Sequence, residues 1–317
     1  RIPGMSEIPQ RQAYGIALAD YGERNPDVVV LDADVSSSTL TKFFADRYPD
    51  RFFNMGVTEA SMVDVGAGLA LGGAIPFVNT FAALLTLRAC EQIRTCVAYA
   101  RTNVKLIGGY AGLSDYKDGP THFATNDVAL MRAMPNLLVV APSDNVEAAR
   151  MVPLIAEHDG PVYMRISRAA VPDVFDETHT VELGKGVTVL PGGDVTIVGS
   201  GSMVGRCVQA ASALAKENIS ARVLAIHTIK PLDVELIHQA AQETGALVTA
   251  EDHSVLGGLG SAVAEAVGSC YPVPIEFIGI CDTFAETGLD TESLMDASGL
   301  GVADIVAAAY RALQRKR

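Results

Sequence analysis

Short apolar runs rich in β-branched residues alternate with helix-like segments along the whole 317-residue chain. Strands that are separated by helices run parallel and are covered on both faces, so the alternation predicts mostly parallel sheets. In the first half the predicted strands are 27–34, 75–79, 104–109, 137–142 and 161–166. Predicted helices lie near residues 10–24, 58–71, 81–101, 126–134 and 144–157.

The alternation pauses over residues 168–184, which contain a proline and several acidic residues but no helical period. It then resumes with predicted strands 194–200, 221–226, 246–251 and 275–280 and helices near 202–217, 233–244, 259–268 and 299–316. We therefore expect an α/β protein of two domains, residues 1–170 and 185–317, joined by a linker at residues 171–184. Each domain should be a mostly parallel sheet with helices on both faces.

The formal net charge of −13 argues against nucleic acid or an anionic membrane as the main partner, because both require a basic surface. No apolar run has the length and flanks of a membrane-spanning helix. Five cysteines without a CxxC spacing indicate reduced, mostly buried thiols. With no visible signal sequence, the expected location is the cytoplasm.

Glu59 lies in a stretch, residues 52–87, in which Asp64 is the only other ionisable residue. One interpretation is structural: Thr58 caps a helix and Glu59 is stabilised in its first turn by the helix dipole. The other is functional, because burial raises the pKa of a carboxyl and allows it to donate a proton to a ring nitrogen. Both interpretations stay open on the residues alone.

A polar loop at residues 109–124 follows a predicted strand and contains "DGPTH". Loops at the carboxyl ends of parallel strands are where α/β proteins bind ligands, so Asp118 and His122 are candidate substrate contacts. A structural role for this pair is equally consistent with the sequence. The segment "GSGSMVG" (199–205) fits a tight strand-to-helix turn better than a dinucleotide loop, and "EDHS" (251–254) fits a loop at a strand end.

Three ordered segments, "MGVTEASMVDVGAGLALGGAIPFVNTF", "DGPTH" and "MPNLLVVAPSD", resemble the pyrimidine-binding domain of transketolase. The rest of the chain is similar to the C-terminal domain of that family. The resemblance implies a transferase that moves a two-carbon ketol unit between sugar phosphates with thiamine diphosphate. In that family a buried glutamate hydrogen-bonds N1′ of the aminopyrimidine and so helps to activate the cofactor. Glu59 stands at the matching position.

The resemblance also implies roles for other positions. Phe81 matches an aromatic wall of the pyrimidine pocket, while Leu84 and Leu87 replace further aromatic residues of the family. Asp118 and His122 match a pair that contacts substrate hydroxyls, and His122 is also assigned to the catalytic residues.

Arg11, Ser38 and Arg168 match the cluster that holds the sugar phosphate, for which guanidinium groups suit the geometry. Tyr110 replaces a histidine of that cluster, so the resemblance leaves the sugar unspecified.

The family binds the diphosphate and a divalent cation, magnesium or calcium, through a GDG motif, and no GDG occurs in this sequence. The resemblance therefore implies a split enzyme whose N-terminal subunit carries that motif and most of the metal ligands. No metal ligand is expected in this chain. We expect a heterotetramer of two plus two subunits with a sizeable apolar interface.

Three alternatives share this fold. One is the β subunit of a 2-oxo acid dehydrogenase, which ranks lower because "DGPTH" suits a polyhydroxylated sugar. The second is an enzyme like 1-deoxyxylulose-5-phosphate synthase, which normally carries its diphosphate domain in the same chain. The third is a non-catalytic regulatory subunit, against which the presence of Glu59 argues.

Overall fold

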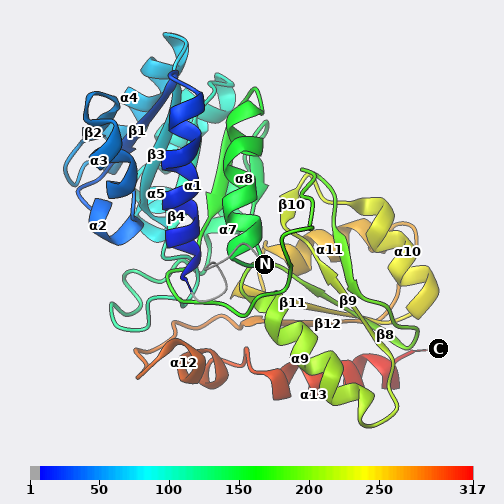
Figure 1. Cartoon of the computed structure of the whole chain (residues 1–317). Helices are drawn as coiled ribbons and strands as arrows, with labels where there is room; N and C mark the ends of the chain where they lie inside the picture. Colours follow the sequence, from blue (N-terminus) through cyan, green and yellow to red (C-terminus); the bar gives the residue numbers. More distant parts are fainter. Residues whose placement is uncertain (1–7, 317) are drawn as a thin grey trace.

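The computed structural model describes residues 8–316 and contains two sheets, each covered by helices on both faces (Figure 1). The predicted α/β class is confirmed. Both sheets are parallel except for one antiparallel edge strand in each. The two sheets define two domains, which lie side by side in the figure.

The first domain is built on a seven-stranded sheet of order β10-β5-β6-β4-β3-β1-β2. Its near-continuous apolar strands are buried between two helical layers, as a parallel sheet requires. The strands are β1 (Val28–Asp32), β2 (Phe52–Asn54), β3 (Ile75–Phe81), β4 (Lys105–Gly109), β5 (Leu138–Val140), β6 (Val162–Arg165) and β10 (Thr228–Lys230).

Alternate side chains of these strands enter two separate apolar cores. One core packs under α1 (Gln10–Arg24) and α8 (Asn145–Glu157). The other packs under α4 (Glu59–Leu71), α5 (Ala82–Arg88), the π-helical segment η2 (Ile93–Tyr99) and α7 (Asp127–Arg132). Shorter elements are α2 (Ser36–Thr39), α3 (Lys42–Arg47), the 3₁₀ turn η1 (Pro49–Arg51) and α6 (Cys90–Gln92).

The second domain is built on a five-stranded sheet of order β12-β11-β8-β9-β7. The strands are β7 (Val187–Leu190), β8 (Val195–Gly199), β9 (Ala221–Ala225), β11 (Leu247–Ser254) and β12 (Ile275–Ile280). One face packs against α9 (Met203–Ala215), α12 (Thr291–Ala297) and α13 (Val302–Gln314), and the other packs against α10 (Val234–Thr244) and α11 (Leu259–Gly268).

The two domains are joined by more than the connecting segment. Strand β10 follows β9 of the second domain in sequence, yet it pairs antiparallel with β5 of the first domain. Thr228 and Lys230 thereby cover what would otherwise be an open sheet edge. The large sheet therefore contains strands from both sides of the predicted linker.

Some local predictions were wrong. The expected helix at 81–101 is three pieces, because α5 ends at Arg88 and a π-helical segment follows α6. The segment 251–254 is the buried end of β11 rather than a loop. Of the cysteines, Cys207 is buried, whereas Cys270 and Cys281 are exposed. The turn after β8 is confirmed, since α9 begins at Met203.

Within residues 8–316, no helix has the length and apolar character needed to cross a membrane.

Candidate active site

Glu59 is the first residue of α4, and it is only 4% exposed. Helix α4 begins shortly after the parallel strand β2 ends at Asn54, so the carboxylate lies at the carboxyl edge of the large sheet. Thr58 occupies the N-cap position, but its hydroxyl donates to the carbonyl of Met55 instead of capping the helix. The burial of Glu59 follows from the apolar stretch around it, while the dipole of α4 favours a negative charge there.

A cation missed by the sequence analysis contacts this carboxylate. Arg88, the last residue of α5, donates from Nη1 to Glu59 Oε1 at 2.8 Å, and its side chain is 51% exposed. The surroundings of Glu59 are therefore not wholly apolar. Sequence alone did not indicate the contact, because 29 positions separate the two residues and only the packing of α4 near α5 brings them together.

An aromatic cluster lies at the ends of β3 and β4. Phe81 ends β3 and stacks on Tyr110, with ring centroids 4.1 Å apart and an interplanar angle of 24°. His122 meets Phe81 edge-on at 6.1 Å, so the loop of residues 109–124 folds back over the end of β3. Leu84 is half-buried, and Leu87 is 53% exposed.

Tyr110 is the centre of the predicted anion site. The guanidinium carbons of Arg11 and Arg168 lie 5.7 Å and 5.5 Å from its ring centroid. Arg11 Nη1 also donates to the Tyr110 hydroxyl at 3.2 Å and to the carbonyl of Ser38 at 2.8 Å. Tyr110 has a φ of +59°, a strained conformation for a non-glycine residue, which these contacts help to maintain.

Buried polar side chains position the segments that carry Arg168 and the Ser38 carbonyl. Gln10 receives a hydrogen bond from the backbone N–H of Ser167 at 2.9 Å, which ties the start of α1 to the segment that carries Arg168. Asp32, at the end of β1, accepts from the N–H of Val35 and from the hydroxyls of Thr39 and Thr41. These bonds shape the turn that presents the Ser38 carbonyl to Arg11.

The loop also holds an acidic pair of which the sequence analysis named only one member. Asp118 is exposed, whereas Asp115 is 3% exposed, and its Oδ1 lies 3.5 Å from Nε of Arg168. Burial, with the Asp118 carboxyl beside it, raises the pKa of Asp115 to about 6. The spacing in "SDYKD" shows two nearby carboxylates, but only the folded loop shows that Asp115 faces an arginine.

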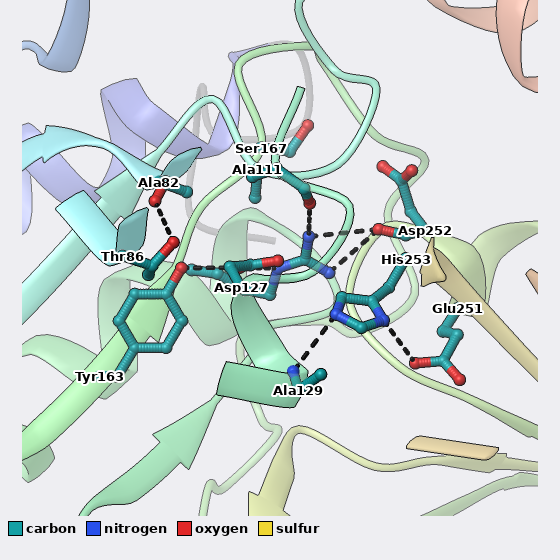
Figure 2. A network of polar contacts seen from close by, with 12 residues as sticks. Ala82, Thr86, Ala111, Asp127, Ala129, Tyr163, Ser167, Glu251, Asp252 and His253 are labelled. Carbon is teal, nitrogen blue, oxygen red and sulfur yellow. Dashed lines mark hydrogen bonds and ion pairs between the residues drawn. The ribbon is translucent and has the colours of Figure 1, made fainter. Parts of the chain in front are cut away.

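The second domain clamps the same loop. Asp252, on β11, accepts from the backbone N–H of Leu113 at 3.0 Å and 3.1 Å. Beside it, Arg165 makes an ion pair with Asp127 at 2.9 Å, and Tyr163 donates to Asp127 at 2.6 Å. Figure 2 shows Tyr163, Asp127 and Asp252 in this buried network between the domains. The loop that carries Asp115, Asp118 and His122 therefore owes its position to both domains.

Burial raises the pKa of Asp252 to about 6, so the folded chain retains this proton to a higher pH than the unfolded chain does. The contribution of Asp252 to the free energy of unfolding therefore falls as pH rises from about 4 to 6. We predict that the unfolding free energy of the wild type, relative to Asp252→Asn, falls by about 1–3 kcal/mol between pH 4.5 and 7. Urea titrations would measure it. The contribution of Asp115 is present in both proteins and cancels; a difference independent of pH would contradict the prediction.

Among residues 8–316, no group of three or more His, Cys, Asp or Glu side chains is arranged to hold a metal ion. What the carboxyl edge does hold is a buried glutamate, an aromatic wall and two arginines around a tyrosine. The fold defines the class: a two-domain α/β protein that gathers acidic, basic and aromatic side chains at the carboxyl edge of its large parallel sheet.

Comparison with known proteins identifies the family. The pyrimidine-binding domain of transketolase matches residues 6–174, and the transketolase C-terminal domain matches residues 184–305. The chain belongs to the transketolase family.

Its relatives include separate subunits. The 6-deoxy-6-sulfo-D-fructose transketolase subunit SqwH from Clostridium sp. (strain MSTE9) is 42% identical over 96% of this chain and 95% of its own length. A subunit of the apulose-4-phosphate transketolase from Phocaeicola vulgatus is 37% identical over 90% of this chain and 95% of its own length. A solved structure described as a split gene transketolase, inactive beta4 tetramer, has a TM-score of 0.92 and 45% identity, covering 98% of this chain and all of that one.

Proposed function

We propose that this chain is the pyrimidine-binding subunit of a split, thiamine-diphosphate-dependent transketolase that acts in the cytoplasm. In this proposal it transfers a two-carbon ketol unit between anionic sugars, together with a subunit that carries the GDG motif. The observation that carries the proposal is Glu59: a carboxylate 4% exposed, at a helix N-terminus, on the same sheet edge as Phe81.

The residues present fit the pyrimidine end of the cofactor. Glu59 offers a buried carboxyl that can hydrogen-bond a ring nitrogen, and Phe81 and His122, which contact each other, offer aromatic surface at the same edge of the sheet. Leu84 and Leu87 would add aliphatic contacts. When bound, thiamine diphosphate supplies the electron sink for the two-carbon fragment. The protein's part is to hold the proton at the ring nitrogen and to exclude water from Glu59.

Exposed apolar residues support the proposal of a partner subunit. Val57 is 65% exposed just before Glu59, Leu87 is 53% exposed just before Arg88, and Phe53 is exposed on the edge strand β2. Such side chains in three adjacent segments are typical of an interface. The partner would bind the diphosphate and its cation, magnesium or calcium, and two copies of each subunit would form the heterotetramer.

The site also supports a sugar with an anionic end. Arg11 and Arg168 flank Tyr110, where they can hold that group, while Asp118 and His122 lie on the loop that reaches toward Phe81. The names of two relatives contain a sulfonated sugar and a sugar phosphate, respectively. The sugars in these two names differ in the charge of their terminal group.

We predict that the isolated chain neither binds thiamine diphosphate with micromolar affinity nor transfers a ketol unit. The reason is that the GDG motif is absent from its sequence, so the charged end of the cofactor has no ligands here. Titration calorimetry with thiamine diphosphate and Mg²⁺ would test binding, and adding the GDG-containing subunit should restore both properties. Micromolar binding by the chain alone would contradict the divided site. Transfer from pyruvate but from no ketose would contradict the transketolase activity.

A further inference from the structure

The anion site contains more charge than its two arginines. Asp115 is buried beside Arg168, with Asp118 next to it on the same loop. Arg168 also lies over the rings of Tyr110 and Tyr116; Lys117 lies over Tyr116, and Arg11 lies over Tyr110. A carboxylate beside the arginine of an anion site must lower the affinity of that site for some anions.

The cluster is also incomplete in its hydrogen bonding. Within the described part of the chain, Nε of Arg11, Nε of Arg168 and Oδ2 of Asp115 are buried polar atoms that make no hydrogen bond, although Nε of Arg168 makes an ion pair with Oδ1 of Asp115 at 3.5 Å. Buried polar atoms nearly always make hydrogen bonds in native proteins, so the two Nε atoms of the arginines beside the Tyr110 ring indicate a place for a polar ligand. The two guanidinium groups can donate to the oxygens of an anion.

Charge counting decides which anion fits. Arg11 and Arg168 together would balance a doubly charged phosphate. When Asp115 is ionised, it offsets the charge of Arg168 and repels a second negative charge on the ligand. A sulfonate carries one charge and three acceptor oxygens, so it keeps the hydrogen bonds of a phosphate without that repulsion. Specificity often depends on such a repulsive element.

We propose that Asp115 is a specificity-determining residue, and that its carboxylate makes this site favour sugars ending in a singly charged group, such as a sulfonate, over sugars ending in a doubly charged phosphate. The inference rests on the proposed function and extends it to the class of substrate.

The ionisation of the groups gives the selectivity a pH dependence. Burial raises the pKa of Asp115 to about 6, close to the second ionisation of a phosphate monoester at about 6. Below this pH, Asp115 is neutral and the phosphate carries one charge. The phosphorylated and the sulfonated sugar then present the same charge to the site. Above it, both negative charges appear together, and the phosphorylated sugar alone is disfavoured.

The test uses the enzyme reconstituted with its GDG-containing subunit and two ketoses that differ only at carbon 6, fructose 6-phosphate and 6-deoxy-6-sulfofructose. At pH 7.5 the wild type should show the higher kcat/KM with the sulfonate. Asp115→Asn should lower the sulfonate-to-phosphate ratio at least about tenfold, chiefly through KM, because it removes one nearby charge. Asp46→Asn makes the same change of charge at an exposed ion pair and should leave the ratio within about twofold.

In the wild type, the ratio should approach one below about pH 5.5 and rise above pH 7. This measurement needs no variant, so it also tests the proposal if Asp115→Asn fails to fold. A ratio that is unchanged in Asp115→Asn, or equal losses for both sugars, would overturn the proposal, since equal losses mean that Asp115 merely supports Arg168.

If the wild-type complex turns over neither ketose, the proposed function fails, and binding still tests Asp115. Calorimetry at pH 7.5 with methyl phosphate and methanesulfonate should then show that Asp115→Asn gains affinity for methyl phosphate relative to methanesulfonate. No relative gain would overturn the role of Asp115.

Discussion

Replacing Glu59 with glutamine in the assembled enzyme is expected to lower kcat for ketol transfer by about 100-fold to 10,000-fold, the range typical of a lost acid–base group. Glutamine keeps the size of the side chain but cannot give or take a proton. The buried position of Glu59 leaves no solvent group to replace it. Steady-state rates with a ketose donor would measure the loss.

The variant should assemble and fold normally. Its lost ion pair involves Arg88, whose side chain is 51% exposed, so the change in stability should be below about 1 kcal/mol. Asp64→Asn is a matched control, because it removes a carboxylate from the exposed side of the same helix, α4. Near-normal activity of Glu59→Gln, with Asp64→Asn also active, would show that Glu59 is not the acid–base group.

The largest loss of stability is expected from Asp127→Asn. This change leaves the guanidinium of Arg165 buried between the domains without its closest counter-charge, 2.9 Å away, and it weakens the acceptor for Tyr163. Breaking a buried ion pair by removing one partner costs about 3–5 kcal/mol. We expect a loss of about 3 kcal/mol, toward the low end, because the carbonyls of Ala124 and Asp252 still accept from Arg165.

Urea unfolding at pH 7 would measure this loss. The control is Lys42→Ala, which breaks an ion pair between two exposed side chains and should cost less than about 0.5 kcal/mol. If Asp127→Asn unfolds at the same urea concentration as Lys42→Ala, the network in Figure 2 contributes no more than a surface pair.

The fold was largely predictable because hydrophobic periodicity is a local property. The predicted helix at 259–268 coincides with α11, and the predicted helix at 10–24 coincides with α1. The burial of Glu59 was predictable for the same reason, since its apolar neighbours are neighbours in sequence.

Contacts between distant segments were not predictable in this way. Arg88 reaches Glu59 because α4 packs near α5, and Arg168 reaches Asp115 because the parallel strands β4 and β6 end at one edge of the sheet. The prediction of a loop at the charged end of β11 was wrong, because a carboxylate can be buried in a strand when a distant segment supplies its partner. Asp252 finds that partner in the backbone of the other domain.

The pairing of β10 with β5 has a consequence for synthesis. The ribosome synthesises β1 to β6, and then β7 to β9 of the second domain, before Thr228–Lys230 is available to pair with β5. Until then the nascent chain exposes the backbone N–H and C=O groups of Leu138–Val140, which can recruit a strand from another molecule. Completion of the large sheet therefore has to wait until the first strands of the second domain have also been synthesised.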